Sequence, residues 1–203
     1  VRTQVCIIGG GPSGLLLSQI LHLGGIDTIV LERQSRAYVL SRIRAGVLEE
    51  GSTALLRKAG VHKRLDREKI LHLGTLLSAR NRSYRIDFRQ RTGKAVYVYG
   101  QTEVTADLYN ARDDMDGVIL DEARDVALHD VETSAPFVTF ERHGKTQRID
   151  CDLIAGCDGF HGISRHHIPK DKRREFERAY PFGWLGVLSE TPPVSDELIY
   201  ANH

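Results

Sequence analysis

The sequence has 203 residues, of which 41% are hydrophobic and 27% charged, with a formal net charge of +1. This length can bury the core of one large domain, or of one domain and part of a second. The near balance of charge excludes a general attraction to nucleic acid or to a membrane surface, and no apolar run approaches the roughly 18 residues of a membrane-spanning helix.

The first predicted elements are a strand, a glycine-rich turn, a helix and a second strand. Residues 5–8 form a short continuous apolar run, which is typical of a parallel strand buried on both faces. Apolar residues recur at helical spacing over residues 12–23, and Gly24-Gly25 ends that helix. Residues 27–31 supply the next strand, so this part of the chain predicts one βαβ unit.

The glycines of the turn fit a dinucleotide-binding motif. Gly9, Gly11 and Gly14 match G-x-G-x-x-G between strand and helix, and Glu32 follows the second strand, 18 residues after Gly14. The three glycines permit a tight turn, close approach of a pyrophosphate, and close packing of helix on strand. The helix N-terminus offers N–H groups to phosphates, and Glu32 can accept hydrogen bonds from a ribose diol. The alternative is an ordinary glycine-rich loop.

Four arginines follow without a clear structural period: Arg33, Arg36, Arg42 and Arg44. Guanidinium groups bind phosphates through paired hydrogen bonds, so we expect this segment to contribute to an anion site beside the glycine turn. In an extended segment Arg42 and Arg44 point in opposite directions, one toward a pyrophosphate and the other toward a second ligand. A solvated basic loop is the alternative.

The middle of the chain mixes helices with a β-rich segment. We expect a helix over residues 48–58, stopped by Gly60, and another from Gln101 to about Met115, with Thr102 as its N-cap. Between these helices the pattern predicts three strands and two turns, at residues 71–78, 84–88 and 95–99, with Asn81 and Gly93 as turn residues.

The later part of the chain is mostly β. Four strands are predicted, at residues 118–120, 125–130, 137–141 and 151–155, with a hairpin turn at His143-Gly144. An apolar run from Phe182 predicts further β structure that reaches Tyr200. Since β-rich segments interrupt the alternation of strand and helix, we predict an α/β fold: a Rossmann-like βαβ layer interleaved with an antiparallel β-rich unit.

An Asp-Gly turn follows the last of these strands, at the end where open α/β sheets bind ligands. There Asp158 can accept from a hydroxyl, and His161 and Arg165 can meet an anion; a plain turn is the alternative. Two weaker candidates are Gln101, a cofactor contact or only a helix-entry residue, and Tyr200, a phenol donor or ordinary strand packing.

The cysteines and histidines do not indicate a metal site or a disulfide framework. Cys6, Cys151 and Cys157 lack C-x-x-C spacing, so we interpret them as buried thiols in a reducing cytoplasm. The N-terminal apolar run lacks the basic-then-apolar order of a signal peptide. No carboxylate or thiol completes a ligand set with the histidines at 161, 166 and 167, so we predict no metal.

Together these residues resemble the class A flavoprotein aromatic hydroxylases. The resemblance spans essentially the whole chain, and its later segments are far more specific than the glycine motif. It is carried by residues 9–17, 32–34, 42–49, 97–104, 157–165, 180–186 and 197–203. It implies a glutathione-reductase-type FAD-binding fold that uses FAD and NADPH.

The resemblance also implies which residues bind each cofactor. FAD would contact Gly9, Gly11, Ser13, Gly14, Glu32, Arg42, Arg44, Ala45, Gly46, Val47, Gln101 and Asp158. NADPH would contact Arg33, Gln34, Tyr38, Arg42, His161 and Arg165. The arginines near Tyr38 favour NADPH over NADH, because a 2′-phosphate needs guanidinium partners.

The implied reaction converts 4-hydroxybenzoate to 3,4-dihydroxybenzoate. NADPH reduces the flavin, and O₂ then forms a flavin C4a-hydroperoxide that transfers oxygen to the ring carbon ortho to the hydroxyl. Tyr200 matches the catalytic tyrosine that hydrogen-bonds the substrate phenol oxygen. The alternatives are a related monooxygenase acting on another hydroxybenzoate, and a non-catalytic module that binds FAD or another nucleotide.

Four segments are expected by the same resemblance. They are an FAD-binding βαβ part (1–70), a β-rich insertion (71–99), a continuation of the FAD-binding domain with the Asp-Gly motif (100–180), and the start of a substrate-binding domain (181–203). Family members are considerably longer, so we expect the chain to correspond to their N-terminal part and to lack the arginine that grips the substrate carboxylate. The expected partners are a small aromatic acid and O₂, and the longer parent is expected to be a homodimer.

Overall fold

The structure, a computed structural model, describes residues 1–187 and 189–202. Its main sheet has six strands in the spatial order β8 (Val118–Leu120), β2 (Thr28–Leu31), β1 (Arg2–Ile8), β11 (Lys145–Gly156), β10 (Phe137–Arg142) and β9 (Arg124–His129). Neighbours from β8 to β11 pair in parallel, whereas β11, β10 and β9 pair antiparallel. This mixture confirms the predicted interruption of a parallel βαβ layer by antiparallel strands.

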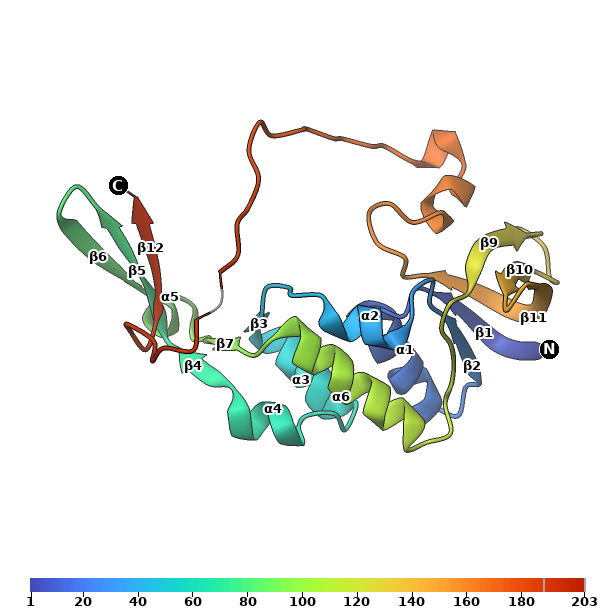
Figure 1. Ribbon diagram of the computed structural model, residues 1–203, viewed down its shortest axis with the longest axis horizontal. Coiled ribbons are helices and arrows are strands. Elements are labelled where there is room, and N and C mark those ends of the chain that lie inside the picture. Colours follow the sequence, from blue (N-terminus) through green and yellow to red (C-terminus); the bar gives the residue numbers. More distant parts are fainter. Residues whose placement is uncertain (188, 203) are drawn as a thin grey trace.

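The other elements of the described residues are two smaller sheets, six α-helices and two short 3₁₀ helices, η1 (Ser164–His167) and η2 (Lys170–Lys172). The first small sheet holds β3 (Val47–Glu49), β7 (Val96–Val98) and β4 (Ile70–His72), and the second holds β12 (Leu198–Asn202), β5 (Gly74–Ala79) and β6 (Arg82–Asp87). The helices are α1 (Pro12–Leu23), α2 (Arg36–Ser41), α3 (Glu50–Lys58), α4 (Lys63–Glu68), α5 (Phe88–Thr92) and α6 (Gln101–Asp113). In Figure 1, α3, α4 and α6 lie between the main sheet and the sheet of β5, β6 and β12, which projects at the far end.

Alternate side chains of β1 pack on its two faces. Val5 and Ile7 lie in a cluster with Val30, against the apolar side of α1. Cys6 and Ile8 point the other way, into a cluster completed by residues of β2, β9, β10 and β11. A strand covered on both faces needs apolar residues at every position, which explains the continuous run at residues 5–8.

A third cluster joins α1 to α3 and α6. Leu15 of α1 is fully buried there, together with Leu56 of α3 and Leu108 of α6. The same cluster includes Tyr99, which directly precedes α6. The N-terminal turn of α1 therefore belongs to the same packed unit as the segment around Gln101, although about 90 residues separate them in sequence.

Strand β11 connects the parallel and antiparallel parts of the main sheet. Its first half pairs with β10 through the turn at His143 and Gly144, whose φ angles are 52° and 69°. Its second half pairs with β1 in parallel, from Asp150 opposite Arg2 to Gly156 opposite Ile8. The predicted hairpin turn is therefore confirmed, and the predicted strand at 151–155 is the second half of a longer strand.

Several local predictions were wrong. Residues 71–78 divide between β4 and β5, which belong to different sheets. Thr102 is not the N-cap of α6, since Gly100 occupies that position without a side-chain cap and the Thr102 hydroxyl bonds elsewhere. Residues 182–187 contain no strand; the predicted apolar run also includes residue 188, which lies outside the described residues. The short helices α2, α4 and α5 were not predicted.

No helix within the described residues combines the length and the apolar composition needed to cross a bilayer.

The contact between Gly14 and β1 leads to a stability prediction. A Cβ at Gly14 would lie 2.0 Å from the carbonyl oxygen of Gly9, so Gly14→Ala requires α1 to move off the strand. We expect the free energy of unfolding in urea to fall by about 3 kcal/mol, as for an overpacked core. Gly51→Ala in α3 is the matched control, because a Cβ there meets nothing within 4 Å; it should stabilise the chain by about 0.5 kcal/mol. Equal unfolding midpoints for the two variants would contradict the assigned contact.

Candidate functional site

The glycine turn has the geometry that the sequence motif predicts. Gly9 has a φ of 109°, and a Cβ there would lie 2.4 Å from the carbonyl oxygen of Cys157. Gly14 lies against the Gly9 carbonyl, whereas a Cβ at Gly11 would meet nothing within 4 Å. Two of the glycines are thus required for packing, and the third leaves the backbone open at the start of α1, where the first N–H groups have no intrahelical acceptor. This open, amide-lined turn fits a pyrophosphate.

Glu32 is held in place through its backbone and its carboxylate. Its N–H donates to the Leu120 carbonyl at 3.0 Å, and its carbonyl accepts from the Ala123 N–H at 2.9 Å. Its Oε2 accepts from the Gly10 N–H at 2.9 Å, and its Oε1 accepts from the Gln34 N–H at 2.8 Å. Each carboxylate oxygen keeps a further lone pair, so the side chain is a preorganised acceptor for a hydroxyl ligand.

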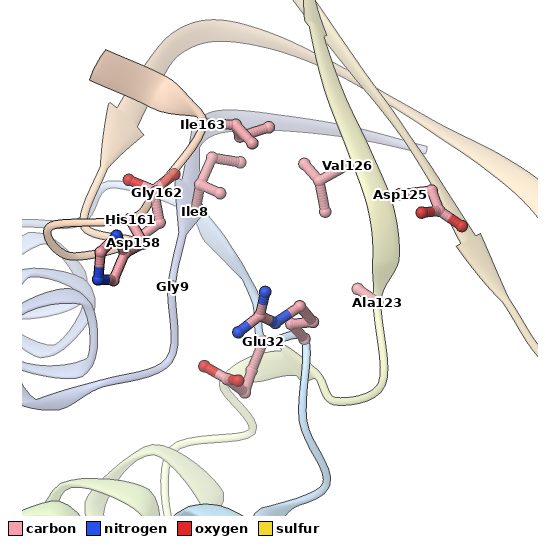
Figure 2. Close-up of a pocket in the computed structure, with 11 residues that line it drawn as sticks. Ile8, Gly9, Glu32, Ala123, Asp125, Val126, Asp158, His161, Gly162 and Ile163 are labelled. Atoms are coloured by element: carbon pink, nitrogen blue, oxygen red, sulfur yellow. The ribbon is translucent and has the colours of Figure 1, made fainter. Parts of the chain in front are cut away.

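The first cavity lies on one side of Glu32 and has a volume of about 520 Å³. Figure 2 shows Asp158 and His161 on one wall, Ala123 and Val126 on the opposite wall, and Glu32 at the base. The β9 side thus combines the apolar Ala123 and Val126 with Asp125, and the segment after the Asp-Gly turn adds the apolar Ile163 to Asp158 and His161. A flat heteroaromatic ring attached to a diol suits such a cavity, because the ring packs on apolar walls and the diol reaches the acid.

The second cavity shares Glu32 and Arg33 with the first, has a volume of about 300 Å³ and is also lined by Arg42 and Arg44. Arg42 donates from Nη1 to the Tyr38 hydroxyl at 2.6 Å, and its guanidinium lies 5.5 Å from the centre of the Tyr38 ring. The other residues that line this cavity come from the glycine turn, the segment after β2 and α6: Gly11, Pro12, Glu32, Arg33, Gln34, Val39, Arg44, Gln101, Thr102 and Thr105. Three arginines around one small cavity favour an anionic ligand.

The segment that carries Arg42 and Arg44 is attached to the start of α6. Thr102 donates from its hydroxyl to the Arg42 carbonyl at 3.0 Å, and the Tyr99 N–H donates to the Gly46 carbonyl at 2.7 Å. A Cβ at Gly46 would lie 2.7 Å from the Cα of Gly100. This close approach explains why a glycine is needed at 46. Residues 42–46 are otherwise exposed or half-buried, so these contacts set where the arginines lie.

Arg36 has a structural role that separates it from the other three arginines. It forms a two-pronged ion pair with Asp113 of α6, at 2.5 and 2.9 Å, and lies 4.3 Å above the Tyr109 ring. This pairing raises the pKa of Arg36 and lowers the pKa of Asp113 through their mutual hydrogen bonds. Arg36 therefore fastens α2 to α6 and does not line either cavity.

Asp158 has a local partner as well as a position at the first cavity. Its Oδ2 accepts from the Ser164 N–H at 2.9 Å and from the Ser164 hydroxyl at 3.0 Å. Gly162 leaves the room for this carboxylate, since a Cβ there would lie 2.1 Å from its Cγ. Asp158 thus orders the turn after β11, and Oδ1 is the oxygen left for a ligand hydroxyl.

The predicted cofactor-binding residues fall into four groups. Gly9, Glu32, Arg33, Asp158 and His161 line the first cavity, and Gly11, Gln34, Tyr38, Arg42, Arg44 and Gln101 line the second, with Glu32 and Arg33 shared. Ser13 and Arg165 line a neighbouring hollow of about 700 Å³ that Asp158 also lines. Gly14, Ala45, Gly46 and Val47 line neither of the two cavities at Glu32.

Two of the predicted residues, Arg165 and Tyr200, lie outside both cavities at Glu32. Arg165 donates to the Phe160 carbonyl, covers the Phe160 ring at 4.7 Å and pairs with Glu175 at 3.4 Å, so its guanidinium is already engaged. Tyr200 lies in β12, in a groove of about 820 Å³ on the small sheet, and lines neither cavity at Glu32.

Sequence reasoning missed the apolar wall of the first cavity. Ala123 and Val126 line it, and the hydrogen bonds of Glu122 to Gln34 and of Ala123 to Glu32 bring the β8–β9 connection there. No local pattern distinguishes these residues from ordinary strand residues. Their role depends on a pairing between segments about 90 residues apart.

Comparisons with known proteins agree with this geometry. The sequence model of a family described as FAD binding domain matches residues 2–203. A p-hydroxybenzoate hydroxylase of Acinetobacter baylyi is 50% identical over 201 residues, which cover 98% of this chain and 50% of that protein. The chain therefore spans about half the length of this relative.

More distant proteins share parts of the chain or its fold. A 3-(3-hydroxy-phenyl)propionate/3-hydroxycinnamic acid hydroxylase of Burkholderia vietnamiensis is 38% identical over 69 residues, which cover 34% of this chain and 12% of that protein. The crystal structure of p-nitrophenol 4-monooxygenase of Pseudomonas putida superposes with a TM-score of 0.71 at 16% identity, covering 82% of this chain and 44% of that one. The latter likeness shows a shared fold.

The three cysteines around β1 and β11 provide a test of burial beside the glycine turn. Burial raises the pKa of Cys6 to about 12, and burial also raises the pKa of Cys151 and of the half-buried Cys157. A raised pKa lowers the thiolate fraction at pH 8, so all three thiols should react more slowly than free cysteine. We expect DTNB to label only Cys157 in the folded chain, faster as the pH rises, and all three after unfolding in urea. Rapid labelling of Cys157→Ser before unfolding would contradict this arrangement.

Proposed function

Because the chain belongs to the FAD binding domain family, we propose that it forms the FAD site of a flavin-dependent aromatic hydroxylase that uses NADPH and acts on 4-hydroxybenzoate. The observation that carries the proposal is the position of Glu32, a fixed carboxylate shared by a cavity with an apolar patch at Ala123 and Val126 and a cavity lined by three arginines. An adenosine diphosphate has the same order of groups: an aromatic ring, a diol and an anion.

In this proposal the ADP half of FAD lies across the two cavities. The adenine packs on Ala123 and Val126, and Glu32 accepts from the ribose diol. The open backbone at Gly11 and the N–H groups of the first turn of α1, including that of Ser13, bind the pyrophosphate. Arg44 and Gln101, at the second cavity, lie on the path from the pyrophosphate to the rest of the cofactor.

We propose that the second cavity also serves NADPH. Arg42 and Tyr38 form a hydrogen-bonded pair at its edge, with Arg33 and Gln34 alongside. A guanidinium that is already oriented by a neighbouring hydroxyl binds a phosphate with little further ordering. This supports preference for the cofactor that carries a 2′-phosphate. His161 lies in the first cavity and Arg165 is engaged with Phe160, so we propose for these two an indirect part through the turn they border.

For the substrate, we propose that the Tyr200 hydroxyl hydrogen-bonds the phenol oxygen and favours its ionised form. The choice of 4-hydroxybenzoate rests on the 50% identity to the Acinetobacter baylyi p-hydroxybenzoate hydroxylase. FAD supplies the redox chemistry with NADPH and O₂ when it is bound; this chain's residues bind it, orient it and present Tyr200 on a separate sheet. We further propose a cytoplasmic protein, and a homodimer for the longer parent.

Two alternatives keep the same cofactor site. One is a hydroxylase of another hydroxybenzoate, since no residue described here grips a substrate carboxylate. The other is a non-catalytic module that binds FAD or ADP. Purified chain should turn yellow with FAD and keep the flavin through desalting. The non-catalytic module would be favoured if flavin is retained but 4-hydroxybenzoate does not stimulate NADPH oxidation, even in a polypeptide extended to the relative's length. If the chain retains no flavin, the proposal is overturned.

The role of Glu32 leads to a binding prediction. We expect Glu32→Ala to weaken binding of ADP and FAD by about 10- to 100-fold, because charge-assisted hydrogen bonds to the ribose are lost. Glu32→Gln keeps one acceptor oxygen, so its affinity for ADP and FAD should lie between those of the unsubstituted chain and Glu32→Ala. Calorimetric titration measures both, with Glu132→Gln on an exposed turn as the control. Equal affinities for Glu32→Ala and the control would exclude Glu32 as the ribose acceptor.

The cationic cavity leads to a prediction on cofactor choice. Arg42→Gln should weaken NADPH binding to the FAD-loaded chain about tenfold more than NADH binding, since only NADPH presents a 2′-phosphate. Added salt should reduce the affinity of the unsubstituted chain for NADPH, and it should narrow the difference in NADPH affinity between this chain and Arg42→Gln. Arg67→Gln, on the exposed side of α4, is the control. If Arg42→Gln weakens binding of NADPH and NADH equally, Arg42 does not contact the 2′-phosphate.

A further inference from the structure

Strand β12, which carries Tyr200, is attached to the small sheet after a long irregular stretch. Residues 173–187 and 189–197 contain no helix or strand, so β12 is not placed by an element directly before it. It pairs in parallel with the edge of β5, from Leu198 opposite Thr75 to Asn202 opposite Ala79. What holds the first residues of β12 therefore decides where Tyr200 lies.

The strongest side-chain contact at this point is between Arg85 and Glu197. Arg85 of β6 donates from Nε to Oε2 and from Nη2 to Oε1 of Glu197, both at 2.7 Å. Its Nη1 also donates to Asp87 at 2.7 Å, which fixes the plane of the guanidinium. Gly74 leaves the space for this group, because a Cβ there would lie 2.7 Å from Nη2. An exposed ion pair contributes to stability mainly when it has this geometry, with two parallel hydrogen bonds and a fixed guanidinium plane.

This pair is specific for one register of β12. Leu76 of β5 is opposite both Arg85 of β6 and Ile199 of β12, so these three side chains share one face of the sheet. Side chains alternate along a strand, so Glu197 belongs to the same face as Ile199. Leu77 is likewise opposite both Tyr84 and Tyr200, which places Tyr200 on the other face.

A slip of one residue would reverse this arrangement. Leu198 and Tyr200 would move to the face of Arg85, and Glu197 would turn away from it. The side chain proposed to meet the substrate would then lie on the wrong side of the sheet. Tyr200 would then no longer line the groove that it shares with Leu77 and Tyr84.

We propose that Arg85 and Glu197 are positioning residues that select the register of β12 and so the face on which Tyr200 lies. The functional consequence rests on the role proposed above for Tyr200, whereas the register itself does not. Two contacts at Leu198 act in the same direction: its N–H donates to His72 Nδ1 at 3.2 Å, and its carbonyl accepts from the Thr75 hydroxyl at 2.9 Å. These two contacts bind backbone groups of Leu198, which every residue has. The ion pair requires a carboxylate at one position, so it distinguishes the native register from neighbouring registers.

Disulfide trapping in the 203-residue chain tests the register directly. Ser78 and Ala201 are opposite each other, so Ser78→Cys with Ala201→Cys reports the native register; Ser78→Cys with Asn202→Cys reports a slip of one residue. Both pairs are oxidised mildly, and the linked peptides are quantified by mass spectrometry. In the Glu197→Gln background we expect the yield of the native link to fall about fivefold.

Matched variants separate register selection from a general loss of charge. Arg57→Gln removes a comparable two-pronged ion pair with Asp66, between α3 and α4, and should leave the native link unchanged. Arg85→Glu combined with Glu197→Arg restores opposite charges and should recover part of the yield, and Arg85→Lys should fall between parent and Glu197→Gln because an ammonium makes no two-pronged pair.

The outcomes decide the proposal. A reduced native link in Glu197→Gln supports it, whether the shifted link replaces it or neither forms. A native link at the parent's yield in both Glu197→Gln and Arg85→Lys overturns it. FAD titration of the same variants should give the parent's affinity, because the pair lies outside both cavities at Glu32. A failure of the register test is thus distinguishable from a failure of the proposed FAD site.

Discussion

The contact between the Gly9 carbonyl and Gly14 is the constraint on which the site depends. It brings the first turn of α1 onto β1 at a distance that no side chain at 14 permits. With α1 at this distance, Leu15 enters the cluster shared with α3 and α6, while Leu17 packs beside β1. The same turn leaves the backbone at Gly11 open. A single steric requirement therefore sets both the packing of the central helix and the exposure of the amides that would face a pyrophosphate.

Glu32 organises what surrounds this turn. Its backbone is held by the connection from β8 to β9, and its carboxylate by amides of the glycine turn and of Gln34. The acid, held by these hydrogen bonds, lines both the cavity that contains Ala123 and Val126 and the cavity that contains Arg42 and Arg44. The arginines are distributed by function: Arg36 fastens α2 to α6, and the others face the anion side.

Local patterns predicted those elements whose burial is complete or whose turn is sterically demanding, such as β1, α1 and the hairpin at His143-Gly144. Local patterns failed where a strand forms only if a distant segment pairs with it. The run at residues 71–78 reads as one strand, but its two halves pair with different sheets. The apolar run from Phe182 includes Trp184, which is 93% exposed, and apolar composition without a partner strand did not produce a strand over residues 182–187.

The sequence by itself determined the glycine turn, the acid after the second strand and the basic segment that follows, because each depends on residue types at short spacing. Only the tertiary structure decided that Ala123 and Val126 form the wall facing Asp158, that Thr102 holds the Arg42 segment, and that Tyr200 lies on the face opposite Arg85. These relations join segments that are distant along the chain. Strand pairing and close backbone contacts create them, and no local pattern encodes which segments will meet.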